Sequence, residues 1–184
     1  MSTSLLYHAF AIRGYEYVRT EYQGGSVIFT IQQAPKTYRC EACGSRDVRP
    51  RGRVVRRFRS LPVGSRPTVV VLSIPRVCCQ ACGVVRQVKL AFADPRRTYT
   101  KAFERYALEL SRSMTILDVA RHLGVSWDII KDIQKRELSR RYAKPKLKDL
   151  RQIAIDEIAV AKGHRYLVVV LDLESGAVVF VGDG

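Results

Sequence analysis

The sequence predicts an α+β protein with several domains: a β-rich, zinc-ribbon-like domain over residues 1–94, a helix-turn-helix domain over 98–142, and a set of strands over 150–184. Three observations lead to this division. Two Cys-x-x-Cys-Gly motifs bracket β-prone segments in the first half of the chain. The apolar period then changes from two to about 3.6 residues, and near-continuous apolar runs return after residue 150.

The first domain is expected to consist mainly of strands. Residues 15–33 predict a β-hairpin, because β-branched and aromatic residues flank a Gln-Gly-Gly-Ser turn at 23–26. Two further strands are expected at 53–59 and 68–74, with Pro75 ending the second. We expect only a thin apolar core in this domain, so that a bound metal would help it to fold.

The two cysteine motifs predict a structural zinc site. Each motif is a tight turn that directs two sulfur atoms to one point, and together they supply the four thiolates that tetrahedral Zn²⁺ prefers. The predicted ligands are Cys40, Cys43, Cys79 and Cys82. A single pair would also be typical of a redox motif, whereas the repeat favours a closed zinc site. Adjacent residues of an extended chain point to opposite faces, so Cys78 is expected to be a small buried apolar residue instead.

The chain is strongly basic, which indicates a polyanionic partner. Its 184 residues carry a formal net charge of +15, and residues 44–101 hold fourteen Lys or Arg against two acids. Nucleic acid is the commonest partner of such a surface. The alternative is a solvated surface, although that role is usually served by charges of both signs. The arginines expected to contact phosphates are Arg51, Arg53, Arg56, Arg57 and Arg59.

The sequence contains no signal for a membrane or for secretion. No apolar run reaches the length of a membrane span, and residues 1–8 lack the pattern of a signal peptide. We therefore expect a cytoplasmic nucleic-acid binder without membrane association. A reducing compartment also favours metal-bound cysteines over disulfides.

The second domain has the spacing of a DNA-binding helix-turn-helix. An amphipathic helix over 99–112 supports a second helix over 116–123. Thr115 is expected to cap the start of that second helix, and Gly124 to follow its end. A third helix is expected over residues 127–140.

The start of the third helix is the expected base-reading surface. Ser126, Trp127 and Lys131 should lie exposed there, with Ser126 also capping the helix. Asp128 and Asp132 are expected on or near the same surface, where they oppose strong phosphate contact. A plain helical hairpin would show the same apolar stripe without binding nucleic acid, but the neighbouring basic domain favours DNA binding.

The last segment predicts three strands, at 152–160, 166–173 and 177–181, with turns at Gly163-His164 and at 174–176. These strands are apolar on both faces, so they are typical of a sheet covered on both sides. Asp156 interrupts the first strand, and a carboxylate there is costly unless it is paired, exposed or bound to metal. We expect a domain that is cut short. The alternative is that the strands pack on the preceding helices, with Asp156 facing solvent on an edge strand.

The order of these parts resembles that of a bacterial insertion-sequence transposase of the ISL-three group. The resemblance covers the chain from about Tyr7 onwards and is most specific in the last segment. The stretches that carry it are Cys40–Gly44, Arg76–Cys82, Ile116–Ile133, Ile155-Asp156-Glu157, Lys162–Tyr166 and Val170–Leu173.

The resemblance implies an RNase H-like α/β catalytic domain with an Asp-Asp-Glu triad, of which residues 150–184 would hold the first three strands. Asp156 corresponds to the first triad carboxylate. Such carboxylates hold two Mg²⁺ or Mn²⁺ ions, which stabilise the attacking and leaving oxygens of phosphoryl transfer. The second Asp and the Glu would follow Gly184, and Asp172 and Asp183 are not expected to replace them. We therefore expect a C-terminally truncated chain that is catalytically inactive alone.

The resemblance also implies the partners and the location. The chain would bind the terminal inverted repeats of its element as double-stranded DNA, in the nucleoid-associated cytoplasm of a bacterium. Its expected protein partners are a second copy of itself or a full-length transposase.

The sequence is compatible with two other functions. The same two binding modules would serve a DNA-binding regulator or inhibitor of transposition. A zinc-ribbon RNA-binding module associated with translation is the other. It ranks lower because a helix-turn-helix suits the major groove of B-form DNA better than that of A-form RNA.

Overall fold

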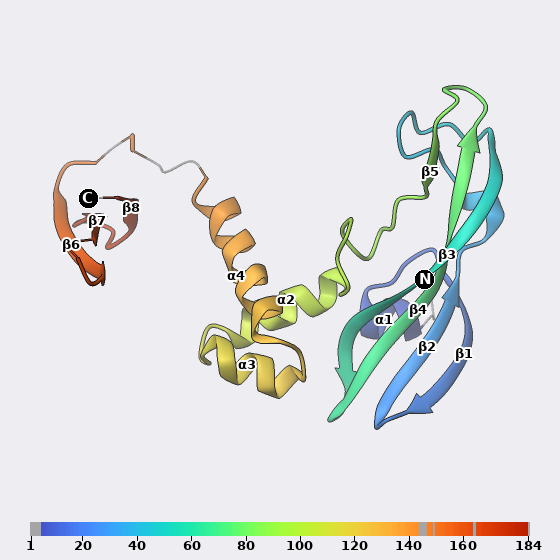
Figure 1. The fold of residues 1–184 in the computed structure, drawn as a ribbon, viewed down its shortest axis with the longest axis horizontal. Helices are drawn as coiled ribbons and strands as arrows, with labels where there is room; N and C mark the ends of the chain where they lie inside the picture. The colour runs from blue at the N-terminus through green and yellow to red at the C-terminus, as the bar shows by residue number, and fades with distance from the viewer. Residues whose placement is uncertain (1–4, 144–146, 149, 164, 184) are drawn as a thin grey trace. The chain divides into compact units, whose positions relative to one another are not determined.

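The protein is described by a computed structural model that covers residues 5–143, 147–148, 150–163 and 165–183. It divides into two compact units, Met1–Ile133 and Gln134–Gly184 (Figure 1). The residues outside the described part include 144–146, between the second and third predicted domains, and His164 of an expected turn.

The first unit contains a five-stranded mixed sheet. Its strands are β1 (Glu16–Gln23), β2 (Ser26–Gln32), β3 (Val48–Val63), β4 (Arg66–Cys79) and β5 (Val85–Gln87). The order is β1-β2-β4-β3, with β5 also paired to β4. Strands β2 and β4 run parallel, and the other pairs are antiparallel. The expected hairpin is confirmed, since Gly24 and Gly25 connect β1 to β2 with φ values of 54° and 74°.

Strands β3 and β4 form a hairpin much longer than the sequence predicts, as Figure 1 shows. The expectation that Pro75 ends the second strand is wrong. Pro50 pairs with Val77 and Arg53 with Pro75, so β3 carries an extra residue opposite this part of β4. Gly52, inside this bulge, has a φ of 99°. A bulge interrupts the ladder locally, and proline is tolerated there because a strand hydrogen bond is already missing.

The core of the first unit is larger than the thin core expected from the sequence. The short helix α1 (Leu5–Phe10), which the sequence did not predict, contributes Leu6 and Phe10 to it. A six-residue helix is too short to show a clear apolar period. Strands β2, β3 and β4 and the segments before β1, before β3 and after β5 supply the rest: Ile12, Ile31, Tyr38, Phe58, Val70, Leu72, Ile74, Val77, Val88, Phe92 and Ala93. A 3₁₀ turn (Pro35–Thr37) leads from β2 to the first cysteine motif.

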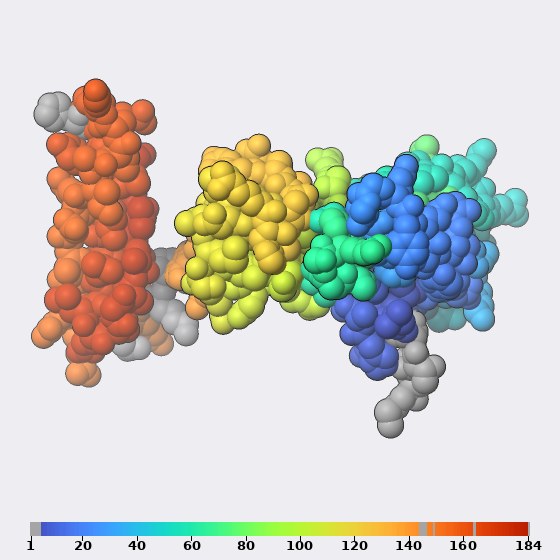
Figure 2. All heavy atoms as spheres, turned by 90° about the horizontal axis from the view of Figure 1, so that it is seen from below, coloured from blue at the N-terminus to red at the C-terminus, as the bar shows by residue number. Residues whose placement is uncertain are grey.

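Two helices and the start of a third form a second cluster in the first unit, yellow-green to orange in Figure 2. They are α2 (Lys101–Leu110), α3 (Ile116–Leu123) and α4 (Trp127–Arg141), and α4 continues past residue 133 into the second unit. Thr115 accepts a hydrogen bond from the N–H of Asp118, and Gly124 ends α3 with φ 59° and ψ 46°. Both expected signals are thus confirmed. The helices bury Tyr99, Phe103, Ala107, Val119, Ala120, Leu123, Ile130 and Ile133.

The second unit contains a three-stranded antiparallel sheet of β6 (Ile153–Ala161), β7 (Arg165–Asp172) and β8 (Val178–Asp183), in the order β6-β7-β8. All three expected strands are present within one or two residues. None of the described residues of this unit is buried. Its sheet is therefore formed without a core of its own.

Candidate zinc centre and nucleic-acid interface

The four predicted cysteines gather at one point where β4 ends. All of their Sγ atoms lie within 4.8 Å of one another: Cys40, Cys43, Cys79 and Cys82. Sγ of Cys40 lies 3.6 Å from Sγ of Cys82, and Sγ of Cys43 lies 3.5 Å from Sγ of Cys79. Each close contact therefore joins one motif to the other. Cys78 stays outside the cluster and is half-buried in β4, rather than fully buried as expected.

Both motifs position their sulfur atoms with the same backbone geometry. The N–H of Gly44 donates to the carbonyl of Cys40 over 2.9 Å, and the N–H of Gly83 donates to that of Cys79 over 3.0 Å. These glycines have φ values of 76° and 70°. Glycine adopts this conformation without a steric cost, which explains its place after each second cysteine.

The thiols compete for protons within the cluster. The N–H of Cys43 lowers the pKa of the Cys40 thiol to about 7, and the N–H of Cys82 likewise lowers the pKa of Cys79. The N–H of Val84 lowers the pKa of Cys82, but the neighbouring thiols outweigh it and raise that pKa to about 12. Four thiolates at this distance repel one another, and a bound cation removes that repulsion.

The spacing of the sulfur atoms fits a zinc ion. Tetrahedral zinc with Zn–S bonds of about 2.3 Å places its sulfur ligands about 3.8 Å apart. The two shortest distances in the cluster are close to that value, and the whole set spans 4.8 Å. Among the residues that the structure describes, no other group of three or more Cys, His, Asp or Glu side chains meets in this way. The cluster supports a structural zinc ion.

The expected base-reading surface lies at the start of α4. Ser126, Trp127 and Lys131 are all exposed, with 42% of Trp127 accessible, and Nζ of Lys131 lies 4.6 Å from the centre of the Trp127 ring. Asp128 is exposed beside them. Asp132 differs from expectation, because its Oδ2 atom accepts a hydrogen bond from Nη1 of Arg97 over 2.7 Å. Its charge is therefore engaged within the protein.

The five arginines expected to contact phosphates separate into two groups. Arg51, Arg53 and Arg57 lie exposed on β3, which is an edge strand of the sheet. Arg56 and Arg59 are only partly exposed and bind other parts of the first unit. Side chains on an edge strand have solvent on their open side, so the first group has the accessibility that a phosphate contact requires.

Arg59 links the sheet to the turn of the helix-turn-helix. Its Nη2 atom donates to the carbonyl of Leu123 at the end of α3, where the helix dipole favours a cation. Its backbone N–H donates to Thr98, and its carbonyl accepts from the N–H of Thr100, both over 2.8 Å. Burial lowers the pKa of the Arg59 guanidinium below its ordinary value. Arg59 therefore acts as a connection between the two cores.

A second connection runs through Arg97, which the sequence did not single out. The carbonyl of Arg97 accepts a hydrogen bond from Nη2 of Arg56 over 2.6 Å. Its side chain forms the ion pair with Asp132 on α4. The only sequence signal for this contact is the adjacent basic pair at 96–97, and such a pair is equally typical of a basic linker.

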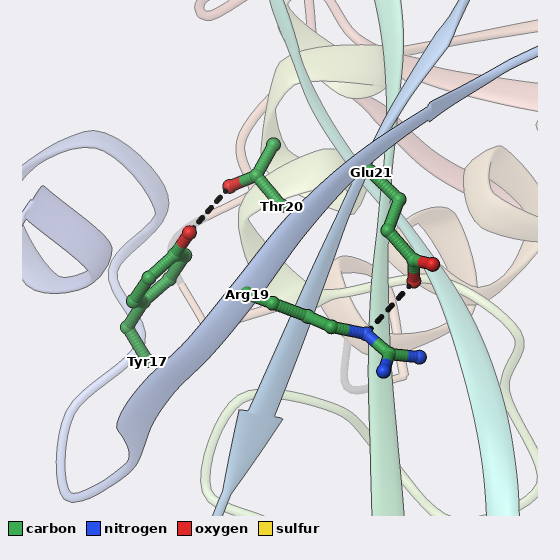
Figure 3. Close-up of polar contacts among 4 residues, drawn as sticks. All are labelled: Tyr17, Arg19, Thr20 and Glu21. Carbon is green, nitrogen blue, oxygen red and sulfur yellow. Dashed lines mark hydrogen bonds and ion pairs between the residues drawn. The ribbon is translucent and has the colours of Figure 1, made fainter.

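Not every exposed arginine of the sheet is free to bind an anion. Arg19 on β1 pairs with Glu21 over 3.1 Å, and Figure 3 shows this pair together with the contact between Tyr17 and Thr20. Tyr17 and Thr20 can meet over 3.0 Å because the register of β1 shifts between Tyr17 and Arg19. The charge of Arg19 is thus already balanced on its own strand.

Asp156 lies on β6, exposed and opposite Val169 of β7. Its Oδ1 atom accepts a hydrogen bond from the N–H of Glu157 over 2.8 Å. Asp172 ends β7 opposite Ile153, and the Ser175 hydroxyl lowers its pKa by donating a hydrogen bond. The described acids of this unit do not form a carboxylate cluster around Asp156. By themselves they do not fit a two-metal centre, which needs several such ligands.

Two family models match parts of this chain. Residues 36–82 match the zinc-finger of transposase IS204/IS1001/IS1096/IS1165, and residues 88–137 match the helix-turn-helix domain of transposase family ISL3. The first range contains the cysteine cluster, and the second contains α2, α3 and most of α4. The chain belongs to the ISL3 transposase family.

Curated relatives of this ISL3 family chain carry transposase names. The transposase for insertion sequence element IS1001 of Bordetella parapertussis is 29% identical over 175 residues, which is 94% of this chain and 43% of the relative. The transposase for IS1557 of Mycobacterium tuberculosis is 30% identical over 150 residues, 79% of this chain and 33% of the relative. The chain thus spans less than half the length of these relatives.

No solved structure matches the ISL3 chain. Within the described residues, no helix combines the length and apolar character needed to cross a membrane.

Proposed function

We propose that this chain is the DNA-binding part of an ISL3 transposase and recognises the ends of its insertion sequence. The observation that carries the proposal is the helix-turn-helix, which presents Ser126, Trp127 and Lys131 at the exposed start of its last helix. Side chains at that position read base edges in the major groove in other proteins with this motif. The transposase names of the relatives favour this function over that of a regulator or inhibitor.

The zinc ribbon supports the same function. We propose that Cys40, Cys43, Cys79 and Cys82 hold one zinc ion, which fixes the end of the β3–β4 hairpin. Arg51, Arg53 and Arg57 on β3 then supply phosphate contacts. Phosphate contacts position a protein on the duplex, while base contacts specify the sequence. The working division is a ribbon domain at 1–94, a helix-turn-helix domain at 98–142 and a third domain from 150.

The third domain is proposed to be the start of an RNase H-like catalytic domain. An antiparallel three-stranded sheet with Asp156 on its first strand supports this assignment. We propose Asp156 as one carboxylate of a magnesium or manganese centre. The remaining ligands are not supplied by the described residues, so we expect the 184-residue chain alone to show no strand transfer. A second copy or a full-length transposase is the proposed protein partner, on DNA in the bacterial nucleoid.

Binding to the terminal inverted repeat tests the DNA-binding function. The probes are a labelled duplex with the repeat that flanks the gene, a shuffled duplex of the same composition, and RNA of the repeat sequence. We expect tighter binding to the repeat duplex, and about a ten-fold loss of that preference in Trp127→Ala or Lys131→Ala. Arg66→Gln, at the far turn of the β3–β4 hairpin, is the control. Equal affinity for repeat and shuffled duplex, or for RNA, would contradict the proposal.

A further inference from the structure

A groove of about 620 Å³ lies on the first unit between β4, β5 and the loop that follows β5. Apolar side chains line its floor: Ile74, Val88, Leu90 and Ala93. Five cations line it as well: Arg56, Arg76, Arg86, Lys89 and Arg96. Only one of these, Arg56, belongs to the arginines that the sequence marked for phosphate contact. The groove is therefore a second basic surface, separate from the exposed arginines of β3.

The lining holds two acids against its five cations. Glu41 pairs with Arg86 over 3.4 Å, and Asp94 pairs with Lys101, outside the groove, over 3.5 Å. Within the described part of the chain, Arg76, Lys89 and Arg96 show no ion pair. Holding several unpaired cations together costs electrostatic free energy. That cost is recovered when an anion binds between them.

The backbone at Arg96 is a further sign that its side chain is needed. Residues 94–97 form a turn in which the N–H of Arg97 donates to the carbonyl of Asp94 over 3.2 Å. Pro95 occupies the second position, and Arg96 occupies the third with a φ of 62°. A proline followed by a residue with positive φ is typical of a type II turn, where glycine is the favoured third residue. A non-glycine residue in this conformation is strained, and such strain is commonest at functional sites.

We propose that this groove binds the sugar-phosphate backbone of duplex DNA, with Arg76, Lys89 and Arg96 contacting phosphates and the apolar floor facing the sugars. Guanidinium groups suit this role because they bind phosphate oxygens through two parallel hydrogen bonds. The loop of the groove leads into α2, whose cap Thr100 begins the helix-turn-helix. The groove thus adds backbone contacts next to the base-reading helices. The inference rests on the proposed DNA-binding function.

The experiment compares single substitutions that each remove one charge. Arg76→Gln, Lys89→Gln and Arg96→Gly are tested, with Arg66→Gln as the matched control, since Arg66 begins β4 at the end far from the groove. Affinity for a labelled duplex of mixed sequence, about three helical turns long, is measured over a range of salt concentrations. Each groove variant should bind several-fold more weakly, with the slope of log K against log salt reduced by about 0.9. The control should match the wild type.

Arg96→Gly separates binding from folding. Glycine relieves the positive φ at this position, so its melting temperature should equal or exceed that of the wild type while its DNA affinity falls. A purely structural role for Arg96 predicts no loss of affinity.

Three outcomes would overturn the inference. If the groove variants bind duplex DNA like Arg66→Gln, the groove is not a DNA site, although the proposed function stands as long as Trp127→Ala loses its preference. If the groove variants bind one separated strand of that duplex more weakly than the wild type does, but bind the duplex equally well, duplex DNA is rejected as the occupant. If the wild type binds no duplex at any salt concentration, the proposed function and the groove both fail.

Discussion

Both units of this protein contain strongly apolar strands, but the units differ in what those strands bury. In the first unit, β4 places Val70, Leu72 and Ile74 in the core. In the second, Ile155, Phe180 and their neighbours stay exposed on the strands of a single sheet. A sheet that is apolar on both faces needs a layer on each side. Strand formation therefore depends on local sequence, whereas a core requires other elements to cover the strands.

Removal of zinc is expected to have the largest effect, and to act on the first unit alone. Apparent binding free energies of structural zinc reach about 10–16 kcal/mol in small peptides. Chelation or Cys82→Ser should therefore strongly destabilise the ends of β3 and β4 beside the cysteines. Hydrogen exchange should show loss of protection there and no change in β6–β8. Cys78→Ser, outside the cluster, is the control, and an equal response in both cysteine variants would reject the four-cysteine site.

A matched pair of phenylalanines tests the difference in burial. Phe58 is 0% exposed in the first core, whereas Phe180 on β8 is 54% exposed. Phe58→Ala should lower the free energy of unfolding of the first unit by about 3–5 kcal/mol. Phe180→Ala should change stability by less than about 0.5 kcal/mol. Chemical denaturation measures both, and a large effect of Phe180→Ala would show that β8 has a covered face in solution.

The connection through Arg59 is expected to matter less than the core. Arg59→Gln cannot maintain the charged contact to the carbonyl of Leu123, so it should cost about 1–3 kcal/mol. Arg57→Gln, its exposed neighbour two residues away, should leave stability unchanged. DNA affinity should show the reverse order. Arg57→Gln should lower it more than Arg59→Gln, because Arg57 is free to contact phosphate. Equal effects on stability would mean that Arg59 does not join the two cores.

The ion pair of Arg97 with Asp132 should have the smallest effect. Both side chains are about one third exposed or more, and exposed pairs contribute about 0.2–1 kcal/mol. Asp132→Asn should reduce stability by that amount at low salt, and by less at high salt. A salt-independent loss would indicate that the pair is more enclosed than its exposure suggests.

Signals that act over a few residues were predicted correctly from the sequence. Thr115 and Gly124 bound α3 as expected, the Gly24-Gly25 turn joins β1 to β2, and the strands after residue 150 are present. The two Cys-x-x-Cys-Gly turns also form as expected, with Gly44 and Gly83 at positive φ. Each of these features depends on caps, turns, periods or short spacings, which are properties of neighbouring residues.

Features that join distant segments were decided only by the tertiary structure. The parallel pairing of β2 with β4, the place of α1 in the core, and the bulge opposite Pro75 all depend on residues far apart in the chain. The arginines show the same division. Their positions in the sequence predicted a basic surface. The packing of β3 against the helix-turn-helix, however, binds Arg59 to the carbonyl of Leu123 and leaves Arg57 exposed. Charge is a property of the sequence, whereas the partner of each charge depends on which elements meet in the fold.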